Sequence, residues 1–212
     1  MSIESTEAWT SGLTRMFTSR RIFGRSGSSV STHADSRYSL LQHFAVNGLI
    51  EQHESHLIDL FGRDQKIICP HRDPVNIVCS IVRTSEYTSS VYSDILKKNK
   101  NLAHKKARRI MQMLAVSAEK YIRWREQNTD IEILDLSYQD INRNTVDVLR
   151  KVYRFLDLEL TSEIEQTVIG WEQDKDRNRF ARNTYAAEEF GLTDDQIRDA
   201  FQPYIARFSE FI

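Results

Sequence analysis

The chain has few of the residues that interrupt helices and none of the long apolar runs that cross membranes. Its 212 residues include three prolines and seven glycines, so few tight turns and much helix are expected. No run approaches the roughly 20 apolar residues of a membrane helix. The first 30 residues lack the apolar core of a secretory signal. We therefore expect a cytoplasmic protein without a membrane span, although the Ser/Thr/Arg-rich, acid-poor start is also typical of an organelle transit peptide.

Cysteine is scarce too, with only Cys69 and Cys79. Both lie in apolar runs, which predicts two buried, reduced thiols. A pair ten residues apart lacks the spacing of a zinc site. The net charge of -1 argues against a protein that coats nucleic acid, so no nucleic-acid partner is expected. A hydrophobic content of 40% and a charged content of 28% are typical of a globular domain with a real core.

The hydrophobic pattern predicts alternating helices and strands after a loosely ordered segment at residues 1–36, in which residues 21–23 form a short strand. Residues 65–70 and 131–138 are short apolar runs typical of buried parallel strands. Asp73 and Pro74 have the composition of a helix N-cap and first helical residue. The remaining helices are predicted at residues 36–49, 57–61, 101–127, 145–156, from 162 through Trp171, and from 193 to 208. This order predicts an α/β domain over residues 37–212, with a small parallel sheet flanked by helices.

The turn between the strand at 65–70 and the helix that follows can bind an anion. A helix N-terminus offers backbone N–H groups and a partial positive charge, which favour phosphate. Arg72 lies one residue before the predicted cap and can add a bidentate, charge-assisted contact. Ser80 lies near the end of the second helical turn, with a hydroxyl suited to the same group. An isolated Arg-Asp-Pro tripeptide would more often be a surface ion pair.

The tripeptide is not isolated, because KIICPHRDPVNIVCSIVR resembles the second donor-binding segment of sulfotransferases that use 3'-phosphoadenosine 5'-phosphosulfate. LDLSYQDI with NTVDVLRKVYRFLDLEL resembles a later strand and helix of the family. NTYAAEEFGLTDDQIRDAFQPYIARF resembles the closing segment of a broad, mostly bacterial branch, and RYSLLQHF and HLIDLF also fit that branch. The resemblance covers about residues 37–208 in order.

The resemblance implies a P-loop-like sulfotransferase fold, helix-rich and shortened at the amino-terminal side. It implies that Arg72 and Ser80 hold the 3'-phosphate of the donor and that Tyr138 flanks its adenine. It also implies a hydroxyl or amine acceptor and no metal cofactor.

Two positions depart from the family pattern. Where the family has a lysine that reaches the sulfate, alignment on His56 and Leu57 places Gln52, which carries no charge. The family's phosphosulfate loop is matched only by GRSGSS, and just 42 residues separate its Gly27 from the Arg72 turn, fewer than the family has. Either an internal segment has been lost or this piece is a chance serine-rich loop. Its candidate phosphate ligands are Arg25, Ser26, Gly27, Ser28 and Ser29.

Two other groups of residues have more than one interpretation. His53 and His56 are three apart, which favours a polar helix start over a metal pair. In the family interpretation either histidine is a candidate general base, because neutral imidazole can take a hydroxyl proton. Residues 97–109 are rich in Lys and Arg, which indicates a solvated helix face or a patch for an anionic partner.

We therefore predict sulfuryl transfer from 3'-phosphoadenosine 5'-phosphosulfate to a hydroxyl or amine acceptor. The alternative is a catalytically impaired relative that binds the nucleotide or another partner.

Overall fold

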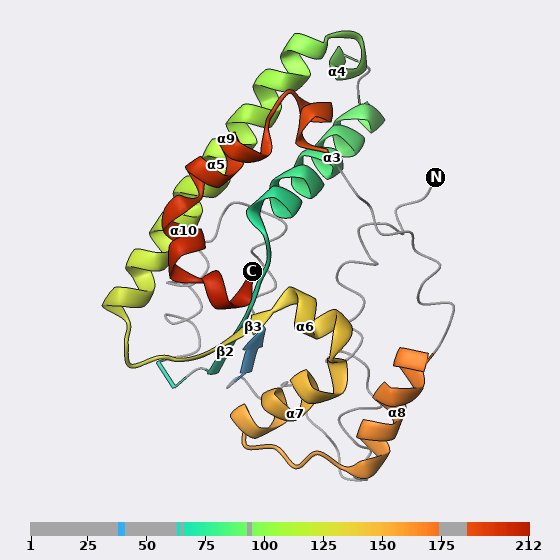
Figure 1. Cartoon of the computed structure of the whole chain (residues 1–212), viewed down its shortest axis with the longest axis vertical. Coiled ribbons are helices and arrows are strands. Elements are labelled where there is room, and N and C mark those ends of the chain that lie inside the picture. Colours follow the sequence, from blue (N-terminus) through green and yellow to red (C-terminus); the bar gives the residue numbers. More distant parts are fainter. Residues whose placement is uncertain (1–37, 41–62, 65, 93–94, 174–185) are drawn as a thin grey trace. The chain divides into compact units, whose positions relative to one another are not determined.

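A computed structural model describes residues 38–40, 63–64, 66–92, 95–173 and 186–212 (Figure 1). These residues divide into two compact units, which we describe separately. The larger unit contains the described residues within 37–143 and 184–212, and the smaller contains those within 144–183. The predicted strand at 21–23 and the predicted helices over 41–61 lie outside the described residues.

The sheet of the larger unit has three parallel strands in the order β1-β2-β3. They are β1 (Tyr38–Leu40), β2 (Lys66–His71) and β3 (Glu132–Ser137). The register aligns Lys66 with Glu132 and His71 with Ser137, so β2 and β3 end together. Both strands were predicted, and their parallel pairing is confirmed. The helix predicted to begin at Ser36 is wrong at residues 38–40, because pairing with the edge of β2 outweighs an ambiguous apolar pattern.

Three helices separate β2 from β3, namely α3 (Pro74–Tyr92), α4 (Ile95–Lys98) and α5 (Lys100–Gln127). The predicted start at Pro74 is confirmed. The 28-residue α5 begins after Asn99, whose side chain accepts a hydrogen bond from the Leu102 N–H at 3.1 Å. A short helix, α6 (Tyr138–Arg143), follows β3 directly.

The C-terminal block, residues 186–212, consists of four short helices. Its first α-helix begins after Thr193, where the predicted helix starts, and Thr193 forms a capping box with Gln196. The single helix predicted through Phe208 is instead broken at Phe201. Pro203 has no N–H, and its ring would clash with the carbonyl of residue 199 in a continuous helix. The four elements are η3 (Ala187–Phe190), α9 (Asp194–Ala200), α10 (Gln202–Arg207) and η4 (Ser209–Phe211).

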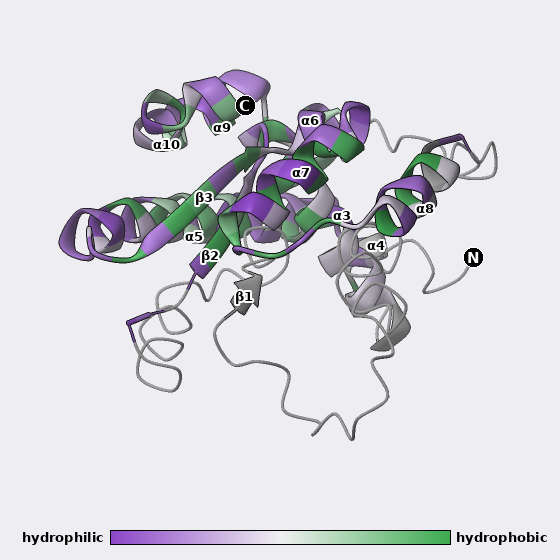
Figure 2. Cartoon of the chain, turned by 90° about the horizontal axis from the view of Figure 1, so that it is seen from below, coloured by the Kyte–Doolittle hydropathy of each residue, from purple (hydrophilic) through white to green (hydrophobic). Residues whose placement is uncertain are grey.

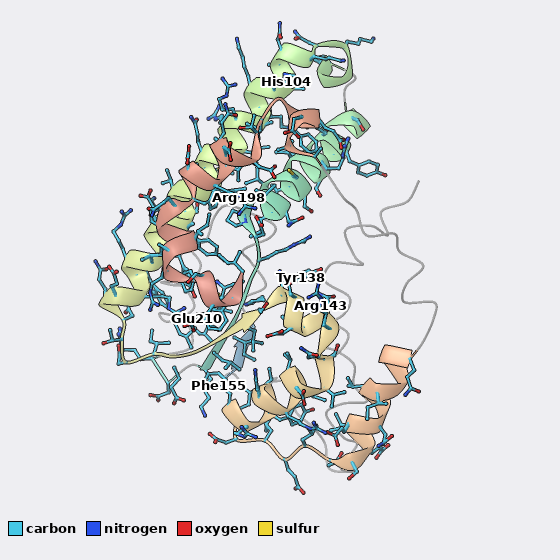
Figure 3. All side chains as sticks on the ribbon, viewed as in Figure 1. His104, Tyr138, Arg143, Phe155, Arg198 and Glu210 are labelled. Atoms are coloured by element: carbon cyan, nitrogen blue, oxygen red, sulfur yellow. The ribbon has the colours of Figure 1, made fainter. Side chains whose placement is uncertain are left out.

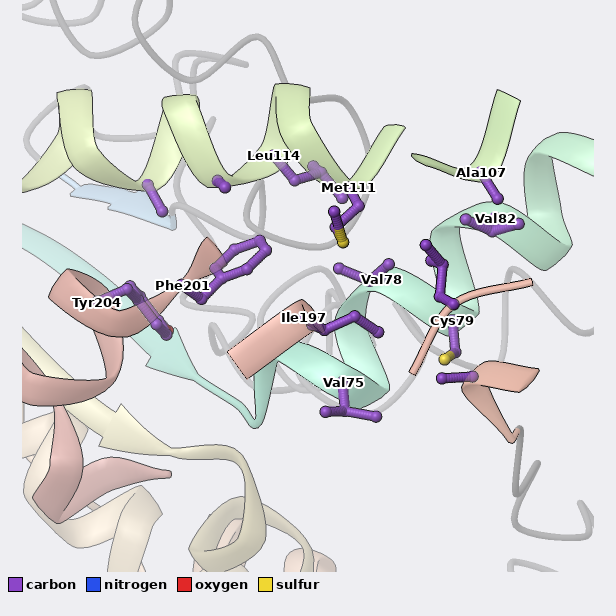
Figure 4. Packing of buried hydrophobic residues seen from close by; sticks show 14 of the residues in the cluster. Val75, Val78, Cys79, Val82, Ala107, Met111, Leu114, Ile197, Phe201 and Tyr204 are labelled. Carbon is purple, nitrogen blue, oxygen red and sulfur yellow. The ribbon is translucent and has the colours of Figure 1, made fainter. Parts of the chain in front are cut away.

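The core of the larger unit lies where α3, α5 and the C-terminal block meet. Figure 4 shows Val78 of α3 between Met111 of α5 and Ile197 of α9, and Val82 of α3 beside Ala107 of α5. Figure 1 shows α9 and α10 lying along α5. Since one wall of this core comes from residues more than 100 positions beyond β2, the C-terminal block is part of the fold around the sheet.

The described part of the smaller unit is a pair of helices, α7 (Thr145–Phe155) and α8 (Ser162–Gln173), which confirms two predicted helices. Leu149, Tyr153 and Val168 form its buried cluster. Beyond α7 and its C-cap Leu156, Asp157 has φ 54°, in the left-handed region. The Leu158 N–H then donates to the Tyr153 carbonyl at 2.9 Å, which closes the helix end.

The hydropathy of the residues agrees with where the strands and helices lie in the fold. Figure 2 shows hydrophobic stretches on β2 and β3 and mixed colouring along α5. Within the described part of the chain, every helix is too short or too polar to cross a membrane.

Candidate functional site

The turn after β2 is built around Asp73. Its carboxylate accepts a hydrogen bond from the Val75 N–H at 2.8 Å, and its carbonyl accepts one from Ile77 at 3.1 Å, so Asp73 is the predicted N-cap of α3. Pro74 has no N–H. Two positions of the first turn therefore have no N–H available to a ligand, so this helix end offers an anion fewer donors than predicted. The cation beside it becomes the more important group for binding an anion.

That cation is Arg72, which lies against Tyr138. Its guanidinium carbon is 4.5 Å from the centre of the Tyr138 ring. Tyr138 is the first residue of α6, directly after β3 (Figure 3). Because β2 and β3 are parallel and end in register, their following residues meet at one edge of the sheet, where open α/β sheets bind ligands. The structure thus brings together two of the predicted site residues.

Ser80 and Arg83 lie on the side of α3 that faces away from the core. Both are only partly buried, whereas Val78, Cys79 and Val82 are buried. Arg83 pairs with Glu189 and lies 4.8 Å from the centre of the Phe190 ring. Arg83 therefore links η3 to α3. Ser80 lies on the side of α3 that faces away from the core, as the helical spacing predicts.

Directly before Arg72, His71 lies at the centre of a buried hydrogen-bond network. Its side chain is 0% exposed and stacks on Phe208, with ring centres 4.1 Å apart. Nε2 lies 2.8 Å from the Asp135 carboxylate, and Nδ1 lies 2.9 Å from the Tyr204 hydroxyl. Arg125 donates to the same Asp135 oxygen at 2.6 Å. The network joins β2, β3, α5 and α10.

Charge in this network is balanced by the Asp135–Arg125 pair. Burial by itself would raise the pKa of Asp135, but hydrogen bonds from His71 and Arg125 hold the pKa below its ordinary value. Cys69 is also nearby, and its sulfur lies within 4.8 Å of ligand atoms of His71 and Asp135. These three residue types can bind a metal, but Arg125 already supplies the positive charge at the carboxylate. The arrangement is that of a hydrogen-bonded structural network.

On the other side of the turn, Arg198 of α9 donates to Asp73 at 2.9 Å (Figure 3). Asp73 by itself would repel an incoming phosphate, and Arg198 offsets that charge. The C-terminal block therefore reaches the turn at two residues, His71 and Asp73.

Sequence reasoning missed the residues of this network. Asp135 could have been found, because a carboxylate inside the apolar strand IEILDLSY requires a buried partner. Arg125, Arg198 and Tyr204 gave no such signal, since their partners are 10 to 133 residues away in the chain.

Several predicted site residues lie outside the described residues. They are His53, His56, Gln52 and the GRSGSS residues Arg25, Ser26, Gly27, Ser28 and Ser29. Their roles therefore stay predictions.

Neither cysteine forms a disulfide and both are buried, as predicted. Burial, with Asp194 and Glu189 nearby, raises the pKa of the Cys79 thiol to about 11, which makes it a poor nucleophile. In the basic stretch, Lys105 and Arg109 are exposed, as expected of a solvated face. Lys106 instead points inward and donates to Ser85 and Ser89 of α3.

Comparison with known proteins identifies the family. A family model described as "Sulfotransferase family" matches residues 51–162, more than half of the chain. The structure is similar to the crystal structure of sulfotransferase STF9 from Mycobacterium avium, with a TM-score of 0.62 and 26% sequence identity. That match covers 76% of this chain and 40% of the mycobacterial chain, so this chain spans less than half of that protein's length. No curated protein matches significantly. The matched segment contains the Arg72 turn and Tyr138, and the chain belongs to the sulfotransferase family.

Proposed function

We propose that this chain binds 3'-phosphoadenosine 5'-phosphosulfate and transfers its sulfuryl group to a hydroxyl or amine acceptor. The observation that carries the proposal is the position of Arg72, between the end of β2 and the start of α3 and against Tyr138. Family membership and the fold shared with a sulfotransferase support it.

In this proposal Arg72 binds the 3'-phosphate of the donor. Its planar guanidinium can donate two parallel hydrogen bonds to phosphate oxygens. Ser80, on the outward side of α3, adds a hydroxyl, and Tyr138 flanks the adenine. Since Asp73 is paired with Arg198, its carboxylate adds little repulsion to the bound phosphate.

The reaction is a displacement at sulfur. The acceptor oxygen or nitrogen forms a bond to sulfur, the bond from sulfur to the 5'-phosphate oxygen breaks, and the acceptor's proton passes to a base. Negative charge develops on the leaving 5'-phosphate, and positioned cations must stabilise it. Arg25 and the other GRSGSS residues are our candidates for stabilising that negative charge. His53 or His56 is our candidate for the base.

The binding half can be tested by calorimetry with adenosine 3',5'-bisphosphate. We expect Arg72→Ala to weaken binding roughly 10- to 100-fold, because a charge-assisted contact is lost. Adenosine 5'-monophosphate has no 3'-phosphate, so its affinity should not change. Arg108→Ala, an exposed arginine on α5, is the matched control. Equal affinities for wild type and Arg72→Ala, or no binding by either, would refute the donor site.

The alternative function, nucleotide binding without efficient transfer, is motivated by Gln52 at the aligned position of the family lysine. Losing one such contact typically costs on the order of 10²–10³ in rate. A labelled-donor assay with phenol, sugar and lipid hydroxyl acceptors distinguishes sulfuryl transfer from nucleotide binding alone. We expect weak turnover in wild type and a gain in Gln52→Lys. Donor binding with no turnover in either protein would favour the alternative.

A further inference from the structure

We propose that the outward side of α5 binds an anionic membrane surface. The binding residues form one row along the helix, the α5 stripe, which consists of Leu102, Lys105, Arg109, Met113 and Val116. The donor site uses none of these residues, so the inference is independent of the proposed function. It rests on the exposure, the spacing and the charge of the stripe.

The α5 stripe exposes more apolar surface than a solvated helix side requires. Leu102, Met113 and Val116 are 41%, 46% and 50% exposed, and they are three of the five exposed large hydrophobic residues in the described part of the chain. Lys105 and Arg109, which lie between them, are exposed as well. Single exposed apolar residues need no explanation, but several together on one surface mark an interaction site.

Helical spacing places the five side chains in a single row. Intervals of three, four, four and three residues keep them on one side of an α-helix, over a length of about 20 Å. The other side carries the buried residues Ala107, Met111 and Leu114, which belong to the core. The stripe is therefore a convex ridge. A ridge can lie on a flat surface, whereas docking a partner's helix would require a groove.

Charge indicates which kind of surface fits. Between Asp94 and Glu119 the sequence has seven Lys and Arg residues and no acidic residue, although the whole chain has a net charge of -1. Two of the seven belong to the stripe, and Lys98 and Lys100 are exposed at its N-terminal end. Positive charge concentrated in this way attracts a surface of opposite charge.

The apolar members of the stripe favour a bilayer over other anionic partners. Single-stranded nucleic acid is bound by cations together with aromatic rings on which bases stack, and the stripe contains no aromatic residue. An anionic bilayer accepts both kinds of side chain that are present. Lys and Arg meet the headgroup phosphates, and Leu, Met and Val enter the boundary between headgroups and acyl chains. Helix α5 would then lie parallel to the membrane plane while its buried side stays packed on the core.

The test is cosedimentation with vesicles of equal parts phosphatidylglycerol and phosphatidylcholine, compared with vesicles of phosphatidylcholine alone. Wild type should bind only the anionic vesicles, and added salt should release it. Arg109→Glu should weaken this binding roughly fivefold or more, because a cation at the surface is replaced by an anion. Arg108→Glu is the matched control. It makes the same change at an exposed neighbour that lies about 100° around the helix, so its effect should be clearly smaller.

A second variant distinguishes a bilayer from a general polyanion. Met113→Ser combined with Val116→Ser keeps every charge and changes only exposed side chains, so its thermal unfolding should match that of wild type. Its binding to anionic vesicles should fall roughly fivefold, while any binding to a short single-stranded DNA should not change. Three results would each overturn the proposal: no binding of wild type to anionic vesicles, equal losses in Arg108→Glu and Arg109→Glu, or vesicle binding unchanged in the double serine variant.

Discussion

The core beneath α3 and α5 and the core between α7 and α8 differ in how far apart in sequence their residues lie. The first gathers side chains from Cys69 to Phe208, and His71 with its polar network stacks on that Phe208. The second has a buried cluster drawn from residues 149–168, closed by a local helix end at Asp157. One is assembled from distant segments and the other from neighbouring ones.

The comparison teaches where the candidate site obtains its rigidity. Arg72 follows β2, but Tyr204 and Arg198, which contact the residues on either side of it, come from the C-terminal block. A site supported by distant segments depends on the whole larger unit, whereas a pair of adjacent helices can lose structure locally.

The largest effect is expected from Phe208→Ala. Phe208 is 1% exposed, stacks on His71 and lies 5.1 Å from the ring centre of Tyr204. Its removal should lower the free energy of unfolding by about 3–5 kcal/mol, measured by urea denaturation. Phe211→Ala, at the partly buried edge of the same cluster, should cost clearly less. Equal losses would mean that the stack on His71 has no special role.

Asp135→Asn should lower the free energy of unfolding by somewhat less, about 3 kcal/mol, because it leaves the Arg125 charge without its carboxylate partner. The pKa of Asp135 is lowered in the folded state, so its contribution is present above the ordinary pKa and is lost as pH falls through the folded pKa. Wild type should therefore lose stability below about pH 4, and the variant should lose less. Asp130→Asn, in an exposed pair with Arg63, is the control and should match wild type near neutral pH. A parallel pH dependence in wild type and Asp135→Asn would contradict this.

In the smaller unit, Leu149→Ala should lower the free energy of unfolding by about 2–3 kcal/mol. This is the lower end for a buried leucine, because a small cluster can relax around the cavity. Hydrogen exchange should rise in α7 and α8, while amides of β2 and β3 keep their protection. Loss of protection in the strands as well would show that the two units unfold together.

The smallest effect is a gain. Asp157 has φ 54° at the end of α7, where glycine is less strained. Asp157→Gly should therefore raise the free energy of unfolding by about 0.5–1 kcal/mol, seen as slower exchange confined to α7. Asp157→Ala should not give this gain, because alanine keeps the Cβ that makes the conformation costly. Stabilisation by alanine equal to that by glycine would contradict the backbone explanation.

Much of the fold followed from local patterns. The apolar runs at 65–70 and 131–138 predicted β2 and β3, and Asp73 with Pro74 predicted where α3 begins. These signals succeed because burial, capping and the missing proline N–H act within a few residues. The strand at residues 38–40 was mistaken for helix, since three residues carry no period and only pairing with β2 decides their state.

The sequence by itself determined the family, the two main strands and the positions of Arg72 and Tyr138 after them. Only the tertiary structure decided that Asp135 pairs with Arg125, that His71 contacts Tyr204, and that Arg198 reaches Asp73. Such contacts join residues up to 133 positions apart, and any polar residue has many candidate partners at that separation. Which of them meet depends on how α5 and the C-terminal block pack around the sheet, because a buried polar group is stable only where the whole fold brings its partner to it.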